Sequence, residues 1–137
     1  MNAYNNQDAG AAGEIVTQVC HAAAHKAGWW MNGAVDHREE VRRGTRFGKA
    51  LVNEKLMLIV SEVAEAMEGY RKGLMDDKLP HRPMIEVELA DAVIRIGDLA
   101  GALQLDLGGA IAEKIAYNAV RLDHKPEARA AAGGKAF

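Results

Sequence analysis

The chain has 137 residues, a length that suits one compact domain and leaves little room for a second. Its formal net charge of −2 lacks the basic surplus of dedicated nucleic-acid binders, and it contains no apolar run of the ~18 residues that a membrane-spanning helix needs. The single cysteine, Cys20, excludes an intrachain disulfide and favours a reducing compartment. We therefore expect one cytoplasmic domain, residues 1–137, that binds neither nucleic acid nor membrane.

The first half of the chain predicts two helices separated by a polar segment. The first helix covers about residues 13–27 and ends at Gly28, because glycine is favoured just past a helix end. Residues 29–49 are polar, arginine-rich and interrupted by glycines, so we predict a loop that can hold a helical turn. The second helix covers about residues 50–72 and ends at Gly73.

The second half predicts two further helices after a loop that contains two prolines. The third helix covers about residues 84–103, and Asp106 is a suitable N-cap for a fourth that reaches about residue 122. The segments that we expect to be flexible are residues 1–12 and 126–137. The predicted fold class is therefore all-α, with four helices and a long first connection.

Pairs of acidic residues with a spacing of three occur on the second and third helices. Glu62 and Glu65 share one helix face, and Glu88 and Asp91 share another. If the two helices face each other, four carboxylates converge. Such a cluster of hard oxygen ligands suits Mg²⁺, with Mn²⁺ as a possible substitute.

The alternative is that each acidic pair lies on a solvated helix face, where most charged residues are found. Two observations weigh against it. Leu51 and Leu58 fall between Glu62 and Glu65 on the helical wheel, and the third helix is apolar almost all round, which predicts that it is buried. Buried acids need cations, so a structural salt-bridge network with Arg71 and Arg95 competes with the metal site.

The last helix carries a polar stripe formed by Lys114, Asn118 and Arg121. Lysine and arginine donate charge-assisted hydrogen bonds to phosphate oxygens, and Asn118 falls within the apolar face, where its amide needs a partner. In the alternative interpretation, the two cations extend from a helix edge into solvent. Beside an acidic metal cluster, phosphate binding is favoured.

These motifs resemble the MazG-like all-α nucleoside triphosphate pyrophosphohydrolases. The family pattern is E-x-x-E, a spacer, then E-x-x-D. Glu62 and Glu65 match the first half, and Glu88 and Asp91 match the second half after the 22 residues from 66 to 87. The downstream K-x-x-x-N-x-x-R matches the stripe on the last helix, and the phrases SEVAEAMEGYRKG and EVELADAVIRIGDLA extend the resemblance over about residues 50–125.

The resemblance implies a Mg²⁺ enzyme that hydrolyses a nucleoside triphosphate at the α-phosphorus and releases pyrophosphate. It implies a helical homodimer or homotetramer, and the four motif acids as metal ligands: Glu62, Glu65, Glu88 and Asp91. The catalytic candidates are Glu62, Glu65 and Glu68, and the sequence does not choose between Glu65 and Glu68 as the base. The phage-like branch, with a purine substrate such as dGTP, fits the compact form and the Trp-Trp segment.

Base recognition is expected from residues around the end of the first helix. Trp29 and Trp30 can stack on a nucleobase, with His25 beside them, although a tryptophan that anchors the loop in the core explains the pair equally well. His21 and His25 have the spacing of zinc ligands but lack a third ligand nearby. The basic run from Arg38 to Lys49 is interpreted as a solvated loop or subunit contact, with a lid over phosphates as the alternative.

Three other functions compete with this prediction. The nearest is an all-α hydrolase specialised for dUTP or dCTP. The second is a catalytically inert helical oligomer that binds a partner, which the retention of all seven motif residues disfavours. The third is a helical nucleic-acid binder that uses the arginine-rich segment, which the net acidity disfavours.

Overall fold

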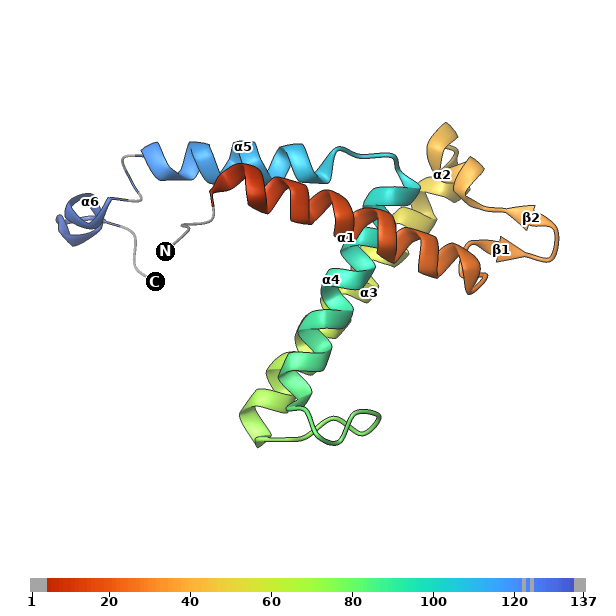
Figure 1. Ribbon diagram of the computed structural model, residues 1–137, viewed down its shortest axis with the longest axis horizontal. Coiled ribbons are helices and arrows are strands. Elements are labelled where there is room, and N and C mark those ends of the chain that lie inside the picture. Colours follow the sequence, from red (N-terminus) through yellow and green to blue (C-terminus); the bar gives the residue numbers. More distant parts are fainter. Residues whose placement is uncertain (1–4, 122, 124, 135–137) are drawn as a thin grey trace. The chain divides into compact units, whose positions relative to one another are not determined.

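The computed structural model describes residues 5–121, 123 and 125–134, and most of them are helical, which confirms the all-α prediction (Figure 1). The helices are α1 (Asn6–Lys26), α2 (Arg38–Arg43), α3 (Arg46–Lys72), α4 (Met84–Ala102), α5 (Leu107–Val120) and α6 (Pro126–Ala130). Two two-residue strands, β1 (Met31–Asn32) and β2 (Val35–Asp36), pair antiparallel with Met31 opposite Asp36. Within the described residues, no helix combines the length and the apolar character needed to cross a membrane.

The chain divides into two compact units, and the boundary falls inside α1. One unit is Ile15–Leu105, which contains β1, β2, α2, α3 and α4. The other joins the described residues up to Glu14 with those from Asp106 onward, so it pairs the start of α1 with α5. There, Gly10 and Gly108 allow close backbone approach, because a Cβ on Gly108 would lie 2.5 Å from the Gly10 carbonyl oxygen. The prediction of a single domain is not tested by this division.

The segment 29–49 is more ordered than predicted. It forms the β1–β2 hairpin and α2, and α3 begins at Arg46, four residues earlier than expected. The Thr45 hydroxyl accepts a hydrogen bond from the Gly48 N–H at 3.0 Å and so caps α3. Gly44 ends α2 with a φ of 65°, a conformation that suits glycine. The helical turn that the prediction allowed is present as α2, but the hairpin and the early start of α3 were not predicted, because the charges and glycines of this segment resemble a loop.

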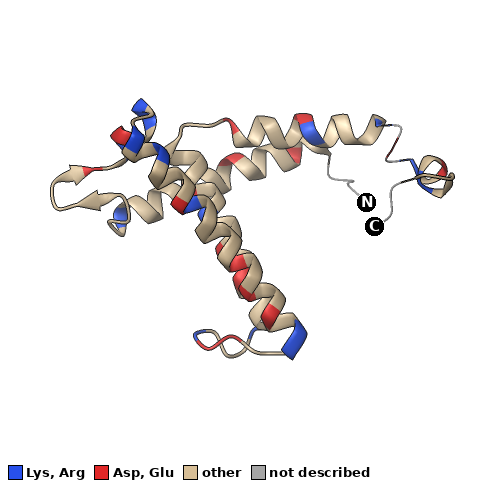
Figure 2. Cartoon of the chain, turned by 180° about the vertical axis from the view of Figure 1, so that it is seen from behind, with Lys and Arg blue, Asp and Glu red and all other residues tan. Residues whose placement is uncertain are grey.

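The loop between α3 and α4 sets these two helices side by side and antiparallel. As predicted, α3 ends at Gly73, whose φ is 62°. The buried Asp76 carboxylate accepts hydrogen bonds from the N–H groups of Lys78 and Leu79, at 2.9 and 2.6 Å, and so folds the loop on itself. Near the loop, a Cβ on Gly69 would lie 2.8 Å from the Met84 side chain, so glycine allows the two helices to approach closely. In Figure 2, acidic positions, drawn in red, recur along this pair of helices.

Helix ends differ from the prediction at both ends of the chain. Helix α1 begins at Asn6 within the segment that we expected to be flexible, because the Asn5 side chain accepts hydrogen bonds from the N–H groups of Gln7 and Asp8. Asp106 caps α5 as predicted, with its carboxylate accepting from the Gly109 N–H at 2.8 Å. The segment 126–137 contains α6, and residues 135–137 lie outside the described part.

The prediction that the third helix is buried all round is wrong for the single chain. Helix α4 buries a face of mostly small residues, but it leaves large apolar side chains 40–49% exposed, namely Leu89, Val93, Ile94 and Ile96. The adjoining α3 also exposes large apolar side chains, namely Leu56, Met57, Val60, Val63 and Met67. Both helices therefore carry large apolar side chains on exposed surfaces of the single chain.

Candidate metal centre and neighbouring cavity

Three carboxylates from α3 and α4 converge into one cluster, which we call the acid cluster: Glu62, Glu65 and Glu88. One oxygen of each lies within 4.8 Å of the others, so the cluster can hold a metal ion. Glu62 and Glu88 are 7% and 8% exposed, whereas Glu65 is exposed to solvent. Buried carboxylates this close repel one another unless a cation or a proton compensates them.

The crowding of these acids favours the protonated form of Glu88. Burial, a hydrogen bond with Glu62 and the neighbouring negative charges of Glu65, Glu62 and Asp91 raise the pKa of Glu88 from 4.5 to about 7. The Arg95 side chain compensates part of the negative charge, since its Nε donates a hydrogen bond to Glu62 Oε1 at 2.5 Å. The ion pair with Arg95 that we considered as an alternative is therefore present, in contact with the acid cluster itself.

The raised pKa of Glu88 predicts a stability that falls with pH in the metal-free protein. A carboxyl with a higher pKa in the folded state stabilises that state fully below about pH 4.5 and loses this contribution as the pH rises through about 7. The loss amounts to a few kcal/mol at most, since one pKa unit corresponds to about 1.4 kcal/mol. Urea unfolding in EDTA between pH 5 and 8 measures it, with Glu88→Gln as the comparison. Parallel pH curves for the two proteins would contradict the expected role of Glu88.

Two other predicted acids stand apart from the acid cluster. Asp91 is exposed and lines the neighbouring cavity, and its charge acts on Glu88, but it is not among the three residues whose oxygens converge. Glu68 lies one turn beyond Glu65 and forms ion pairs with Lys72 and, at 3.4 Å, with Arg71. The structure therefore brings together three of the four predicted ligands and directs Glu68 to surface cations.

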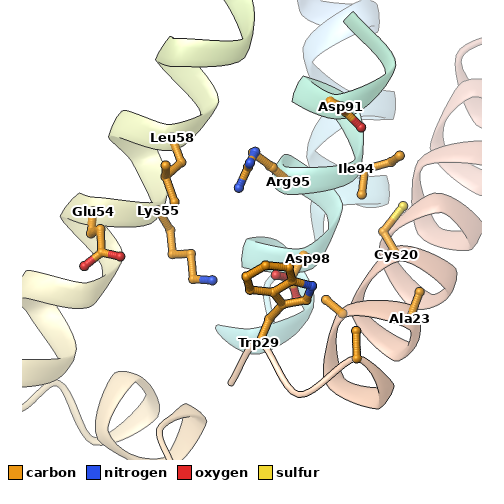
Figure 3. A pocket seen from close by; sticks show the side chains of 12 residues that line it. Cys20, Ala23, Trp29, Glu54, Lys55, Leu58, Asp91, Ile94, Arg95 and Asp98 are labelled. Carbon is orange, nitrogen blue, oxygen red and sulfur yellow. The ribbon is translucent and has the colours of Figure 1, made fainter. Parts of the chain in front are cut away.

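A cavity of about 550 Å³ lies beside the acid cluster, between α1, α3 and α4 (Figure 3). Its apolar wall consists of Ala23, Ala24, Ala27, Leu58 and Ile94, and Trp29 closes one side. Lys55 and Arg95 point into the space between α3 and α4 (Figure 3). The volume falls in the range of small-molecule sites, which are mostly apolar with a few convergent polar groups.

The sequence prediction missed Lys55, which is seven residues before Glu62 and therefore lies on the same face of α3 two turns away. Its ammonium lies 4.5 Å from the centre of the Trp30 ring. The signal was available, because Lys55, Leu58 and Glu62 follow helical spacing along one stripe.

The two adjacent tryptophans have different environments. Trp30 has no exposed surface and donates a hydrogen bond from Nε1 to Asp98 Oδ1 at 2.8 Å. The base-stacking prediction is therefore wrong for Trp30, which anchors the connection in the core with Val41, Leu99 and Ala102. Trp29 is 73% exposed and lines the cavity, so it has a free face for a ligand.

The two histidines of α1 contact acidic residues. His21 Nδ1 lies 2.8 Å from Asp98 Oδ1, and His25 Nε2 lies 3.8 Å from Asp36 Oδ2. Neither belongs to the residues that line the described cavity, and base binding by His25 stays a prediction. Their contacts explain the i, i+4 pair without a zinc ion.

The arginine-rich segment is solvated in part, as predicted, because Arg43, Arg46 and Lys49 are exposed. The other two cations of the run make contacts within the chain. Arg38 binds the Asp36 carboxylate through Nε and Nη2, at 3.0 and 2.6 Å. Arg42 donates from Nε to the Ala102 carbonyl oxygen at 3.0 Å, at the end of α4. These contacts fix the hairpin and α2 in place, which disfavours a mobile lid that uses Arg38 or Arg42.

The predicted phosphate-binding stripe follows the second half of α5 and the residue just beyond it. The Lys114 ammonium lies 4.9 Å from the centre of the Tyr117 ring, and Asn118 Oδ1 is buried without a hydrogen-bond partner among the described residues. Arg121 lies just beyond the helix, which ends earlier than predicted, and its Nε donates to Asp123 Oδ1 at 2.9 Å. The stripe and the acid cluster belong to different compact units, so their convergence on one substrate stays a prediction.

No family model, curated protein or solved structure matched the chain in comparisons with each.

Proposed function

We propose that this chain is a magnesium-dependent nucleoside triphosphate pyrophosphohydrolase of the MazG-like kind. The observation that carries the proposal is the convergence of Glu62, Glu65 and Glu88 from α3 and α4, with two of the three carboxylates buried. A cavity suited to a small molecule lies directly beside them. These residues are also the ones that match the E-x-x-E and E-x-x-D motifs of that family.

The acid cluster is close to the size that Mg²⁺ requires. Ligands on opposite sides of an octahedral Mg²⁺ lie about 4.2 Å apart, since each bond is about 2.1 Å, and the cluster oxygens lie within 4.8 Å of one another. Glu62 and Glu88 are the buried ligands in this proposal, and the negative charge of Asp91 acts on Glu88. When bound, Mg²⁺ neutralises the triphosphate and lowers the pKa of an attacking water.

The chain's own residues supply the remaining chemistry in this proposal. Glu65 is the exposed member of the acid cluster, whereas Glu68 is held by Arg71 and Lys72, so we choose Glu65 as the base that accepts the proton of the attacking water. The water oxygen bonds to the α-phosphorus, and the bond from that phosphorus to the oxygen bridging to the β-phosphorus breaks. Pyrophosphate leaves with the electron pair.

The nucleobase and the phosphates of the substrate have different candidate partners in the chain. Trp29 offers an exposed indole face in the cavity for stacking on a nucleobase, with a purine such as dGTP as the substrate that we favour. Lys114 and Arg121 are the proposed donors to phosphate oxygens, and the unpartnered Asn118 oxygen supports a role for that amide in accepting a hydrogen bond from a ligand.

We also propose that the chain works as a homodimer or homotetramer in the cytoplasm. The support is the row of large apolar side chains that α3 and α4 leave exposed in the single chain, including Val60, Val63, Met67 and Val93. A second copy covers this surface in the proposal. Light scattering on the eluted protein distinguishes a monomer from either oligomer.

The test of the proposed function is pyrophosphate release from the eight common ribo- and deoxyribonucleoside triphosphates, each with Mg²⁺, Mn²⁺ or EDTA. We expect release that depends on the metal, with one nucleotide preferred. A preference for dUTP or dCTP would favour the pyrimidine-specific alternative. Folded protein that releases pyrophosphate from none of the eight in Mg²⁺ would contradict the proposal and favour an inert binding protein.

A further inference from the structure

Arg95 contacts both the acid cluster and the cavity. Its Nε donates to Glu62 Oε1 at 2.5 Å, and the guanidinium also forms part of the cavity lining. The Arg95 side chain is 40% exposed, whereas the Glu62 side chain is 9% exposed. In Figure 3 the guanidinium extends from α4 towards α3, over the space that the cavity occupies.

Arg95 is the cation that pairs with the acid cluster in the described part of the chain. The other cations of α3 and α4 that form ion pairs there bind elsewhere: Arg71 and Lys72 bind Glu68, and Arg82, in the preceding loop, binds Glu86. Lys55 lies against the Trp30 ring. Without Arg95, the buried Glu62 carboxylate would face Glu65 and Glu88 with no other ion pair among the described residues to compensate its charge.

We propose that Arg95 is a built-in counter-ion that competes with the divalent cation for Glu62 and that metal binding displaces it towards the cavity. This inference rests on the proposed function, since it takes the acid cluster as the metal site. Glu62 Oε1 is held by Arg95 in the metal-free state, and the same carboxylate is needed as a buried ligand for the cation. The guanidinium and the metal ion are both positively charged and repel each other, so binding of either one to Glu62 lowers the affinity of Glu62 for the other.

Displacement of Arg95 couples the metal site to the cavity. The guanidinium already borders the cavity, so when it leaves Glu62 its N–H groups become available to oxygen acceptors of a ligand there. In the metal-free chain, Nε is occupied by Glu62. Metal binding and ligand binding therefore strengthen each other, because coupling between two sites is reciprocal.

The test is calorimetric titration of the full chain with Mg²⁺ alone, with wild type compared to Arg95→Met. Methionine keeps an extended apolar side chain and removes the charge. We expect Arg95→Met to bind Mg²⁺ about 5- to 10-fold more tightly, a range typical of coupling between sites. In EDTA the same variant is expected to melt at a lower temperature than wild type, and saturating Mg²⁺ should remove most of this difference. Arg95→Lys, which keeps the charge without the guanidinium, should bind Mg²⁺ with an affinity between the two.

Arg82→Met is the matched control, because it removes an arginine that pairs with the exposed Glu86 and does not pair with the acid cluster. Its Mg²⁺ affinity should equal that of wild type. Unchanged or weaker Mg²⁺ binding by Arg95→Met and Arg95→Lys would overturn the inference and leave the proposed function standing. If Arg95→Met fails to fold without metal, Arg95→Lys decides the question alone. Wild type that binds neither Mg²⁺ nor Mn²⁺ would overturn both proposals.

Discussion

Replacing Glu62 by glutamine is expected to lower kcat/KM for pyrophosphate release by about 100- to 1,000-fold, the range seen when one group that stabilises charge at a catalytic site is removed. Glu62 is buried, lies in the acid cluster and accepts the hydrogen bond from Arg95. Glutamine preserves the size of the side chain but removes the negative charge that binds the metal. Steady-state kinetics with the preferred triphosphate and saturating Mg²⁺ measure the loss.

Glu86→Gln is the matched control for Glu62→Gln. Glu86 lies in the first turn of α4 and forms an exposed ion pair with Arg82 at 2.7 Å, away from the acid cluster. Exposed ion pairs contribute little to stability, so this variant should retain activity within about twofold of wild type. Circular dichroism establishes that both variants are folded. Equal activity of Glu62→Gln and wild type would exclude the acid cluster as the metal site.

Replacing Trp30 by alanine is expected to lower the free energy of unfolding by about 3–5 kcal/mol, as other tryptophan deletions in protein cores do. Trp30 has no exposed surface, packs against Val41, Leu99 and Ala102, and donates its indole N–H to Asp98. Alanine leaves a void beside these core residues. Among the described residues, the buried Asp98 carboxylate has two hydrogen-bond partners, Trp30 and His21. The substitution removes the first of them.

Trp29→Ala separates this structural role from ligand binding. Trp29 is 73% exposed, so its truncation should change the free energy of unfolding by less than about 1 kcal/mol. If Trp29 stacks on the base, the same variant should raise KM. Urea unfolding of both variants in Mg²⁺ provides the comparison. Equal losses of stability would contradict the assignment of Trp30 as the anchor and Trp29 as the exposed partner.

The long helices could be predicted because their ends carry local signals. Gly73 and Asp106 mark the end of α3 and the cap of α5 in the structure as in the sequence. Thr45 carried the same kind of signal for the start of α3, but the arginines and glycines around it resembled a loop. The β1–β2 hairpin has only two residues in each strand, which is too short to produce a visible alternation.

Only those features of the candidate site that follow from helix periodicity could be predicted from the sequence. A spacing of three places Glu62 and Glu65 on one helix face. The register between α3 and α4 cannot be read from this spacing, because it depends on the loop around Asp76 and on the close approach of Gly69 to Met84. That register brings Glu88 into the acid cluster and leaves Asp91 at the cavity. Burial of Trp30 likewise depends on tertiary contacts, so the neighbouring Trp29 was indistinguishable from it in the sequence.

The most direct test of the central claim is phosphorus NMR of the preferred triphosphate, incubated first with chain stripped of metal by EDTA and then with excess Mg²⁺. We predict no change until Mg²⁺ is added, followed by equal amounts of nucleoside monophosphate and pyrophosphate. Such a result would establish attack at the α-phosphorus by a metal-dependent enzyme. Diphosphate and orthophosphate as products, or an unchanged triphosphate in the presence of folded chain and Mg²⁺, would contradict the account.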